Sequence, residues 1–371
     1  MPDPASVDLR VLLAAGGTGG HLFPAEALSH ALRARGVTVS LVTDQRAFEF
    51  TDGFPADEIH AVASGTPSGR SLMAKVKAAA SILRGVIAAR KLIGTLKPDV
   101  VVGFGGYPTV PPLLAATMLR VPSIVHEQNA VVGRANRFLS GRVGTIATGF
   151  AQVGGLSESA RAKCVHVGNP ARPAVVQAAA LPFQPPEASG DLHLLVFGGS
   201  QGARVMADVL PPTLEQMAPA DLARLVVVQQ ARAEDDRRVR SIYERLGVRH
   251  EVAPFFQDLP ARMARAQLVI ARSGASTVAE LGVIGRPSIL VPLPGALDQD
   301  QTANARSLEN IGAATVILQP DFTPNRLASE LHRLLGDPGS LSRAAAAART
   351  AGIPDASERL ADLVIATARR A

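Results

Sequence analysis

The sequence predicts an α/β protein with two Rossmann-like, doubly wound domains that face each other across a cleft. Short apolar segments alternate with longer amphipathic ones, which is typical of βαβ units in a mostly parallel sheet. An apolar run, a glycine-rich turn and a helix occur in residues 7–35 and again from residue 193, about half the chain later. Because parallel sheets bind ligands beyond the carboxyl ends of their strands, two such domains would form a ligand-binding cleft.

The first half contains five apolar runs that favour buried strands. We expect these strands at residues 7–15, 37–43, 98–104, 122–127 and 143–148. Amphipathic segments predict helices at about 21–35 and 72–96. Ser71 is the expected N-cap of the second helix, since its hydroxyl can accept a first-turn N–H.

The second half repeats the pattern after a proline-rich segment, 181–191, that is expected to be a linker. Strands are expected at residues 193–199, 224–230, 268–274 and 287–292, each followed by a helical stretch, the first from about residue 202. Residues 354–369 form the last expected helix.

The composition excludes several classes of protein. With 47% hydrophobic residues, the chain is not disordered. One cysteine excludes a disulfide scaffold and fits a reducing cytoplasm, and no cluster has metal-ligand spacing, so we expect no metal and no cofactor. The apolar stretch 108–119 is too short to span a membrane, and the acidic, proline-rich N-terminus is unlike a signal peptide.

The basic excess lies in the first half of the chain. Residues 1–170 carry 17 basic and 11 acidic side chains, whereas residues 171–371 carry 21 of each. Segment 70–97 has seven basic residues and no acidic one, which indicates an anionic partner or an ordinary solvated helix face. No tryptophan and only two tyrosines disfavour stacking on bases, so we expect no nucleic acid as partner, while an anionic membrane surface and a solvated helix face both stay open.

A basic stripe runs along the helix expected at 72–96. Lys77, Arg84 and Lys91 recur every seven residues, and Arg70 continues the series. The helix also carries two apolar sets, which are Met73, Val76, Leu83 and Ile87 beside the stripe, and Ile82, Val86 and Ile93 elsewhere. One set must face the core and the other could enter a lipid interface, but the sequence does not decide which.

Three glycine-rich turns at strand ends favour a ligand that carries phosphate. They are Gly16–Gly20, Gly103–Gly106 and Gly198–Gly202. Glycine lets the backbone approach an anion closely, and a helix N-terminus offers N–H groups to it. None of the turns is a P-loop, and the first matches the dinucleotide fingerprint poorly, so a dinucleotide oxidoreductase with Asp44 on the ribose is the less favoured alternative.

Other polar residues follow strands, where a site would form. His21 begins a helix whose dipole favours the neutral imidazole, which could accept a proton or only bond the loop. The run 126–129, His-Glu-Gln-Asn, could read sugar hydroxyls or be a polar loop. Arg172 could bind a phosphate bidentately or brace the domain junction.

A second polar cluster is expected in the other domain. The turn Ser273–Thr277 would expose N–H groups at a helix start. Glu280 could accept two bonds from a ribose diol or simply complement the helix dipole. Residues 298–301 either cap the next helix or read hydroxyls, and no G-x-S-x-G nucleophile elbow is present.

Together these motifs resemble the MurG family, whose N-acetylglucosaminyltransferases complete the lipid-linked peptidoglycan precursor. The resemblance rests on LAAGGTGGHLFPAEAL, VVGFGGYPTVPP, VHEQNAVVGRANRFL, GNPAR, VFGGSQGAR, ARSGASTVAEL and the D-x-x-Q-x-x-N-A run at 298–305. The motifs occur in the family's order over nearly the whole chain. The chain departs at Asp300, where the family often has Gln, at Thr109 and Val110, where it often has Ser and Gly, and at 228–231, where it often has His-Gln-Ser/Thr-Gly.

The resemblance implies a glycosyltransferase-B fold. Residues 1–169, with a C-terminal helix at about 352–371 packed back on them, would bind the lipid acceptor, and residues 170–351 would bind UDP-N-acetylglucosamine (UDP-GlcNAc). The enzyme would transfer GlcNAc, with inversion, to the 4-hydroxyl of MurNAc in undecaprenyl-pyrophosphoryl-MurNAc-pentapeptide, converting lipid I to lipid II. It would lie peripherally on the cytoplasmic face of the inner membrane, with cell-wall synthesis proteins as candidate partners. The alternatives are a glycolipid glycosyltransferase, a UDP-GlcNAc epimerase or a non-catalytic membrane adaptor.

The resemblance also implies roles for single residues. The expected substrate-binding residues are Arg172, Ser200, Phe256, Ala275, Ser276, Thr277, Val278, Ala279, Glu280 and Gln301, with Thr18, Gly19, Gly20 and Asn129 completing the site. Ser200 would contact the donor phosphates, the Phe256 backbone would read uracil, and Glu280 would bind the ribose hydroxyls. The expected acceptor pyrophosphate loops contain Gly16, Gly17, Gly105, Gly106 and Tyr107. His21 is the candidate general base.

Overall fold

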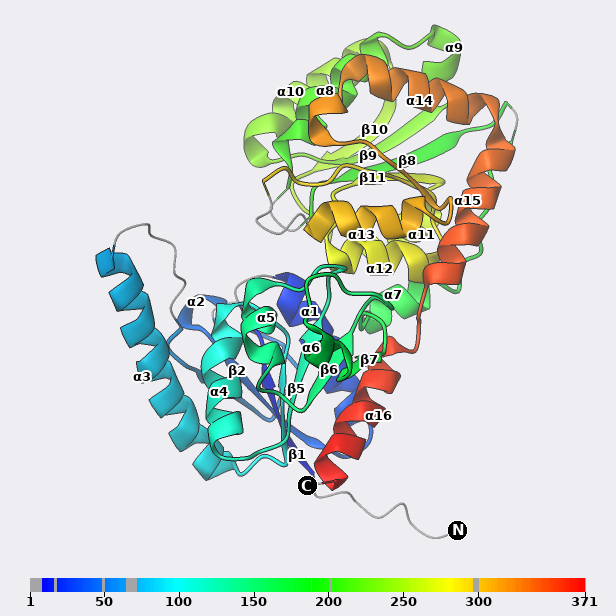
Figure 1. The fold of residues 1–371 in the computed structure, drawn as a ribbon. Coiled ribbons are helices and arrows are strands. Elements are labelled where there is room, and N and C mark those ends of the chain that lie inside the picture. The colour runs from blue at the N-terminus through cyan, green and yellow to red at the C-terminus, as the bar shows by residue number, and fades with distance from the viewer. Residues whose placement is uncertain are drawn as a thin grey trace, which may run out of the picture. The chain divides into compact units, whose positions relative to one another are not determined.

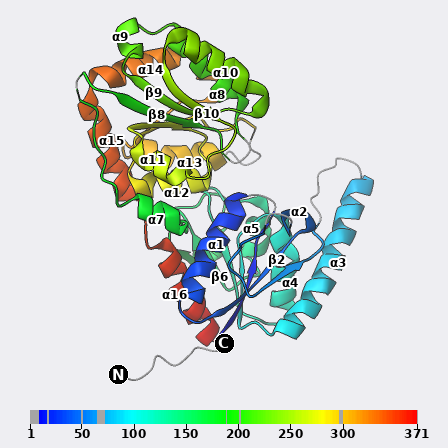
Figure 2. The same ribbon diagram turned by 180° about the vertical axis from the view of Figure 1, so that it is seen from behind.

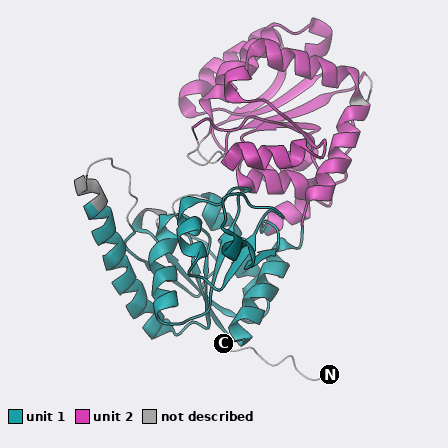
Figure 3. Cartoon of the chain, viewed as in Figure 1, with its two compact units in different colours: residues 1–172, 354–371 teal, residues 173–353 magenta. Residues whose placement is uncertain are grey.

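The chain folds into two compact units, residues 1–172 with 354–371 and residues 173–353 (Figure 3). This computed structural model describes residues 9–16, 19–48, 51–64, 72–187, 189–199, 202–295 and 300–370. The proline-rich segment 181–191, expected to link the halves, lies inside the second unit. Arg286 of that unit donates to the carbonyl oxygen of Leu181 at 3.1 Å, and Arg349 donates to that of Ala179, just before the segment, at 2.8 Å.

The first unit contains a seven-stranded parallel sheet in the order β3-β2-β1-β4-β5-β6-β7. Its strands are β1 (Arg10–Ala14), β2 (Thr38–Thr43), β3 (Glu58–Ala61), β4 (Val100–Gly103), β5 (Ser123–Glu127), β6 (Thr145–Thr148) and β7 (Cys164–His166). Its helices are α1 (Gly19–Arg33), α2 (Gln45–Phe48), α3 (Leu72–Leu96), η1 (Tyr107–Thr109), α4 (Val110–Met118), α5 (Arg134–Ser140), α6 (Glu158–Arg161) and α16 (Ala356–Arg369). The strand order reverses between β1 and β4, which is where doubly wound sheets bind ligands.

Both faces of this sheet are covered by helices, which explains why its inner strands are continuously apolar. α1 and α16 cover one face, where Leu28 and Leu360 enter the core, and α3, α4 and α5 cover the other, where Leu113 does (Figures 1 and 2). The C-terminal helix is also tied to the end of α1 by Arg35, which pairs with Asp362 at 2.7 Å.

The structure settles which apolar set of α3 faces the core. Val86 and Ile93 are buried, and the helix packs against α4. The other set is exposed, with Val76, Leu83 and Ile87 at 56%, 62% and 62%. The basic side chains beside it are also exposed, and these are Lys77, Arg84 and Lys91. Arg70 and Ser71 lie outside the described residues, as does the side chain of Met73.

No helix within the part of the chain that the structure describes has the length and apolar character needed to cross a membrane.

The second unit contains a six-stranded parallel sheet in the order β10-β9-β8-β11-β12-β13. Its strands are β8 (Leu192–Phe197), β9 (Leu225–Gln230), β10 (Arg249–Ala253), β11 (Leu268–Ala271), β12 (Ser288–Leu290) and β13 (Ala314–Val316). Its helices are α7 (Pro173–Ala178), α8 (Arg204–Glu215), α9 (Pro219–Leu222), α10 (Ala233–Leu246), α11 (Leu259–Arg265), α12 (Ala275–Ile284), α13 (Asp300–Glu309), η2 (Gln319–Asp321), α14 (Pro324–Gly336) and α15 (Pro338–Ala351). The switch point lies between β8 and β11, and α8, α10 and α14 pack together over one face of the sheet (Figure 1).

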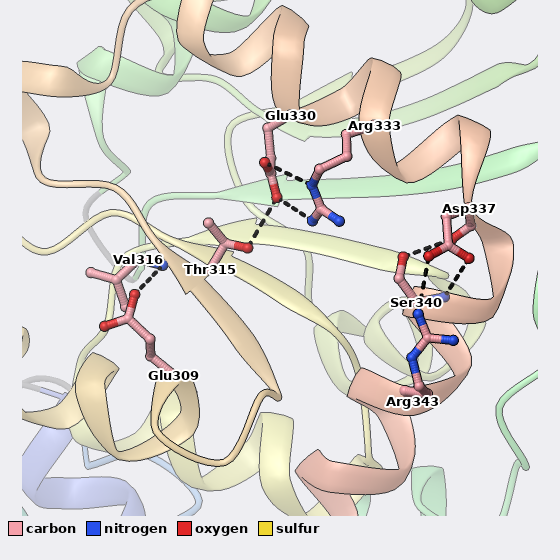
Figure 4. Close-up of polar contacts among 8 residues, drawn as sticks. All are labelled: Glu309, Thr315, Val316, Glu330, Arg333, Asp337, Ser340 and Arg343. Atoms are coloured by element: carbon pink, nitrogen blue, oxygen red, sulfur yellow. Dashed lines mark hydrogen bonds and ion pairs between the residues drawn. The ribbon is translucent and has the colours of Figure 1, made fainter.

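Side chains close the β13 edge of this sheet (Figure 4). Glu309 accepts the Val316 N–H at 3.2 Å, which removes a backbone donor that another strand could otherwise pair with. Glu330 accepts the Thr315 hydroxyl at 3.0 Å and pairs with Arg333 at 2.6 Å. A cavity of about 440 Å³ lies beside these contacts, at the amino ends of β11 to β13 and hence at the opposite end of the sheet from its switch-point turns.

Candidate functional site

In the first unit, three turns meet at the carboxyl ends of neighbouring strands. Gly16 follows β1, Gly105 and Gly106 follow β4, and Asn129 follows β5, and these strands are adjacent in the sheet. The first two turns approach closely, since a Cβ added to Gly106 would lie 3.5 Å from the Gly16 carbonyl oxygen. The predicted pyrophosphate loops are therefore brought together, although Gly17 and Thr18 lie outside the described residues.

The imidazole of His21 lies against the second of these turns. His21 is the third residue of α1, after Gly19 and Gly20. A Cβ added to Gly105 would lie 3.2 Å from His21 Nε2 and 3.3 Å from Asn136 Nδ2, so no larger residue fits there without movement. Gly105 and Gly106 also have φ angles of 87° and 74°, which favour glycine.

Burial lowers the pKa of His21 from 6.5 to about 4. The imidazole is therefore neutral near pH 7, the state that can accept a proton. Burial is the physical cause of this lowered pKa, whereas the sequence suggested that the helix dipole would keep the imidazole neutral. A group of such low pKa is a weak base, but a nearby anion would raise its pKa by stabilising the imidazolium.

Glu127 organises the loop that follows β5. It is 1% exposed, and its carboxylate accepts the N–H groups of Asn129 (2.9 Å) and Gly133 (2.9 Å) and the side-chain amide of Asn136 (2.9 Å). Burial raises the pKa of Glu127, and these bonds oppose that rise. The carboxylate thus fixes Asn129 and, through Asn136, the side of the His21 pocket.

The four residues of the run 126–129, expected either to read sugar hydroxyls or to form a polar loop, differ in their exposure. His126 is fully buried and its Nε2 lies 3.0 Å from the Gly168 carbonyl oxygen, while Gln128 donates to the Phe104 carbonyl oxygen at 2.8 Å. Burial lowers the pKa of His126 to about 4. Only Asn129 of the four is partly exposed, so the other three build the site without lining it.

Arg172 ends the first unit and packs on α1. Its guanidinium lies 4.2 Å from the ring centroid of Phe23, a cation–π contact that orients the side chain. Because Phe23 lies on α1 two residues after His21, Arg172 is held near the first turn.

In the second unit, the predicted residues also gather at the carboxyl edge. Ala275 is the first residue of α12, and Gly274 is its N-cap, so the backbone N–H groups of residues 275–277 belong to the first turn of the helix. Glu280 lies on the same helix and is 8% exposed. Gln301 is the second residue of α13, and its backbone oxygen accepts the Ser273 hydroxyl at 2.8 Å. Ser200 lies outside the described residues.

Phe256 follows β10 and is nearly buried. It is 7% exposed, and the Arg262 guanidinium lies 4.3 Å from its ring centroid. The side chain therefore anchors this segment in the protein, which fits an expected contact made by the backbone.

Sequence reasoning missed the role of Arg272 at the edge of the second sheet. Arg272 is 8% exposed and donates to the carbonyl oxygens of Val291 (3.0 Å) and Pro292 (3.0 Å), which holds the loop after β12. The position of Arg272 at a strand end was visible, but its carbonyl partners depend on a loop 19 and 20 residues away in the chain. Among the described residues, no group of three or more His, Cys, Asp or Glu side chains is arranged to hold a metal ion.

Comparison with known proteins identifies the family. The N-terminal domain of glycosyltransferase family 28 matches residues 11–148, and the C-terminal domain of that family matches residues 193–360. A protein from Methylobacterium nodulans, named UDP-N-acetylglucosamine--N-acetylmuramyl-(pentapeptide) pyrophosphoryl-undecaprenol N-acetylglucosamine transferase, is 61% identical over 363 residues, 97% of each chain. A protein of the same name from Rhodopseudomonas palustris is 59% identical over 95% of this chain and 97% of that protein.

Solved structures agree with this relationship. The crystal structure of Acinetobacter baumannii MurG is 30% identical, with a TM-score of 0.78 over 96% of this chain and 99% of that one. A UDP-GlcNAc 2-epimerase from Neisseria meningitidis has a TM-score of 0.65 at 14% identity over 98% and 100% of the two chains, a likeness of fold alone. The fold is therefore shared with epimerases, whereas the sequence identity is with the transferases. By its sequence identity and by its fold, the chain belongs to the MurG family of glycosyltransferase family 28 enzymes.

Proposed function

We propose that this chain transfers GlcNAc from UDP-GlcNAc to lipid I to give lipid II, in peptidoglycan synthesis. The observation that carries the proposal is the 61% identity, over 97% of both chains, with a relative named for that transfer. The acceptor atom is the 4-hydroxyl of MurNAc, and the transfer proceeds with inversion. Because epimerases share only the fold at 14% identity, the epimerase alternative has weaker support.

In this proposal, each of the two units binds one of the two substrates. The first unit binds the lipid acceptor, with its pyrophosphate near Gly105 and Gly106, where the lack of a Cβ lets an anion approach the backbone. The second unit binds UDP-GlcNAc at the switch point between β8 and β11. The 275–280 segment of α12 supports this role, because its first turn presents N–H groups.

His21 is the proposed general base. Its pKa of about 4 keeps the imidazole neutral before the acceptor binds, and the anionic pyrophosphate then raises its proton affinity. The base takes the proton of the acceptor hydroxyl as that oxygen attacks C1 of GlcNAc, and UDP leaves. Backbone N–H groups at the turn that follows β8 and the side chain of Arg172 stabilise the charge on the departing diphosphate.

The exposed face of α3 is the proposed membrane contact. Val76, Leu83 and Ile87 are more than half exposed, and Lys77, Arg84 and Lys91 flank them. Apolar side chains can enter the lipid interface while the basic side chains meet anionic headgroups. The chain would then lie peripherally on the cytoplasmic face of the inner membrane, where lipid I is presented to it.

The proposal is tested with purified protein, UDP-[14C]GlcNAc and a lipid I analogue. We expect radiolabel in the lipid product and release of UDP. Hydrolysis or epimerisation of the donor without transfer to the lipid would contradict the proposed function.

A further inference from the structure

We infer that Gln230 is a positioning residue for the donor nucleotide, because its side chain joins the turn after β8 to the segment after β10. The inference rests on the proposed function, which places UDP-GlcNAc on the second unit. Gln230 is the last residue of β9, the strand between β8 and β10, and it is 6% exposed. A carboxamide buried at this edge needs partners for both its oxygen and its nitrogen.

Two hydrogen bonds form the link. Gln230 Oε1 accepts the Gly198 N–H at 2.9 Å, and Nε2 donates to the Pro254 carbonyl oxygen at 3.1 Å. Gly198 begins the glycine-rich turn proposed to bind phosphate, and Pro254 lies two residues before Phe256, whose backbone is proposed to read the base. One side chain therefore fixes the spacing of two backbone segments that follow different strands.

The two described ends of the glycine-rich turn lie close together. A Cβ added to Gly198 would lie 2.0 Å from the Ala203 nitrogen, so no larger residue fits at Gly198 without movement. Arg232, two residues after Gln230, donates to the Gly202 carbonyl oxygen at 3.2 Å. The chain after β9 thus holds the turn at both ends, while Ser200 and Gln201 between them lie outside the described residues.

This arrangement has a defined consequence for binding. Backbone N–H groups bind a phosphate strongly only when they already point at it, because reorienting them costs part of the binding free energy. A nucleoside diphosphate that contacts both segments depends on their spacing, which the Gln230 carboxamide sets. Loss of the carboxamide should therefore weaken binding of the whole nucleotide and leave the chemical step, which occurs at the sugar, unchanged.

The test compares Gln230→Met with a matched control, Gln267→Met. Methionine has a similar length but makes neither hydrogen bond. Gln267 makes the same pair of bonds at the amino end of β8, where it accepts the His193 N–H at 2.8 Å and donates to the Gln184 carbonyl oxygen at 3.2 Å. Gln230→Asn provides a milder variant, since it keeps both polar groups but is one methylene too short to reach both partners.

We expect Gln230→Met, which loses both hydrogen bonds, to bind UDP about tenfold or more weakly in isothermal titration calorimetry, and Gln230→Asn to show a smaller loss in the same direction. The KM for UDP-GlcNAc should rise by a similar factor, with kcat at saturating donor within about twofold of wild type, and Gln267→Met should match wild type in both. Wild-type UDP affinity in Gln230→Asn, an equal loss in Gln267→Met, or a fall in kcat with unchanged KM would overturn the inference. Since UDP titration needs no acceptor, a wild-type protein that binds UDP but transfers nothing would contradict only the proposed function.

Discussion

Replacing Glu127 by glutamine should disorder the loop that carries Asn129. One carboxylate oxygen accepts the backbone and side-chain N–H groups of Asn129 (2.9 and 3.3 Å), and the other accepts the Gly133 N–H and the Asn136 amide (2.9 Å each). All four partners are donors. Glutamine offers one oxygen and one NH₂ group, so in either orientation two of the four bonds become contacts between two donors.

The expected cost follows from these bonds. A hydrogen bond to a charged group contributes about 1.5–3 kcal/mol, so the loss of two predicts about 3–6 kcal/mol. That range approaches the stability of a whole domain, about 5–15 kcal/mol, and the loop should therefore open locally before the unit unfolds. An opening free energy lower by 3 kcal/mol corresponds to about 100-fold faster amide exchange.

Hydrogen exchange measured by mass spectrometry on peptides from 127–137 gives the local effect, and steady-state kinetics give the functional one. We expect protection in these peptides to fall about 100-fold or more and the KM for the lipid I analogue to rise more than the KM for UDP-GlcNAc, because Glu127 belongs to the first unit, which is proposed to bind the acceptor. Glu158→Gln, an exposed carboxylate on α6 of the same unit, is the control and should behave as wild type. Wild-type protection in Glu127→Gln would refute the assignment of this carboxylate as the organiser of the loop.

Three further predictions concern the first unit. His21→Ala should lower kcat by about 100-fold or more, the usual contribution of a general base, and leave UDP affinity unchanged; wild-type turnover would remove His21 from that role. His126 has a pKa of about 4 against 6.5 when unfolded, so the unfolded state binds the proton first and His126 alone should account for a loss of up to about 3 kcal/mol between pH 6.5 and 4 in urea unfolding, beside a similar contribution from His21. His126→Asn should reduce the pH dependence by the His126 share, and pH profiles parallel to wild type would contradict this prediction. The triple variant Lys77→Glu, Arg84→Glu and Lys91→Glu should bind anionic vesicles about 100-fold or more weakly in co-sedimentation, with neutral vesicles as the control. Unchanged binding to anionic vesicles would contradict the proposed membrane contact.

The sequence predicted the inner strands of both sheets but not their edges. All nine expected strands are present, whereas β3, β7, β10 and β13 were missed, and these four are the outermost strands. An inner strand such as β4 is buried at every position, which produces a continuous apolar run. β7 has no buried residue, so burial imposes no pattern on its sequence. The pairing of the four edge strands depends on neighbouring strands that are distant in the chain.

The backbone turns of the candidate site were predictable from the sequence, whereas the side-chain contacts that support these turns were less so. Glycine turns leave a local mark, because positive φ angles and close approaches permit few other residues, as at Gly105. The sequence around Glu127 contains no comparable local signal, because Glu127 is one of four polar residues that follow a strand. Its role as the acceptor that holds the loop depends on Asn136, which α5 places beside it.

The charge asymmetry acquires a physical meaning once the ion pairs are placed. In the second unit, arginines are neutralised by neighbouring acids, as in Arg238 with Asp235 (2.7 Å) and Arg249 with Asp191 (2.6 Å). On α3, none of the basic side chains at 77, 84 and 91 forms an ion pair with another residue that the structure describes. These residues are seven apart, about 10 Å along the helix, so salt largely screens their mutual repulsion, but each of them can attract an external anion. The first unit therefore presents a row of basic side chains on one helix beside exposed apolar side chains, the combination with which amphipathic helices bind an anionic lipid surface.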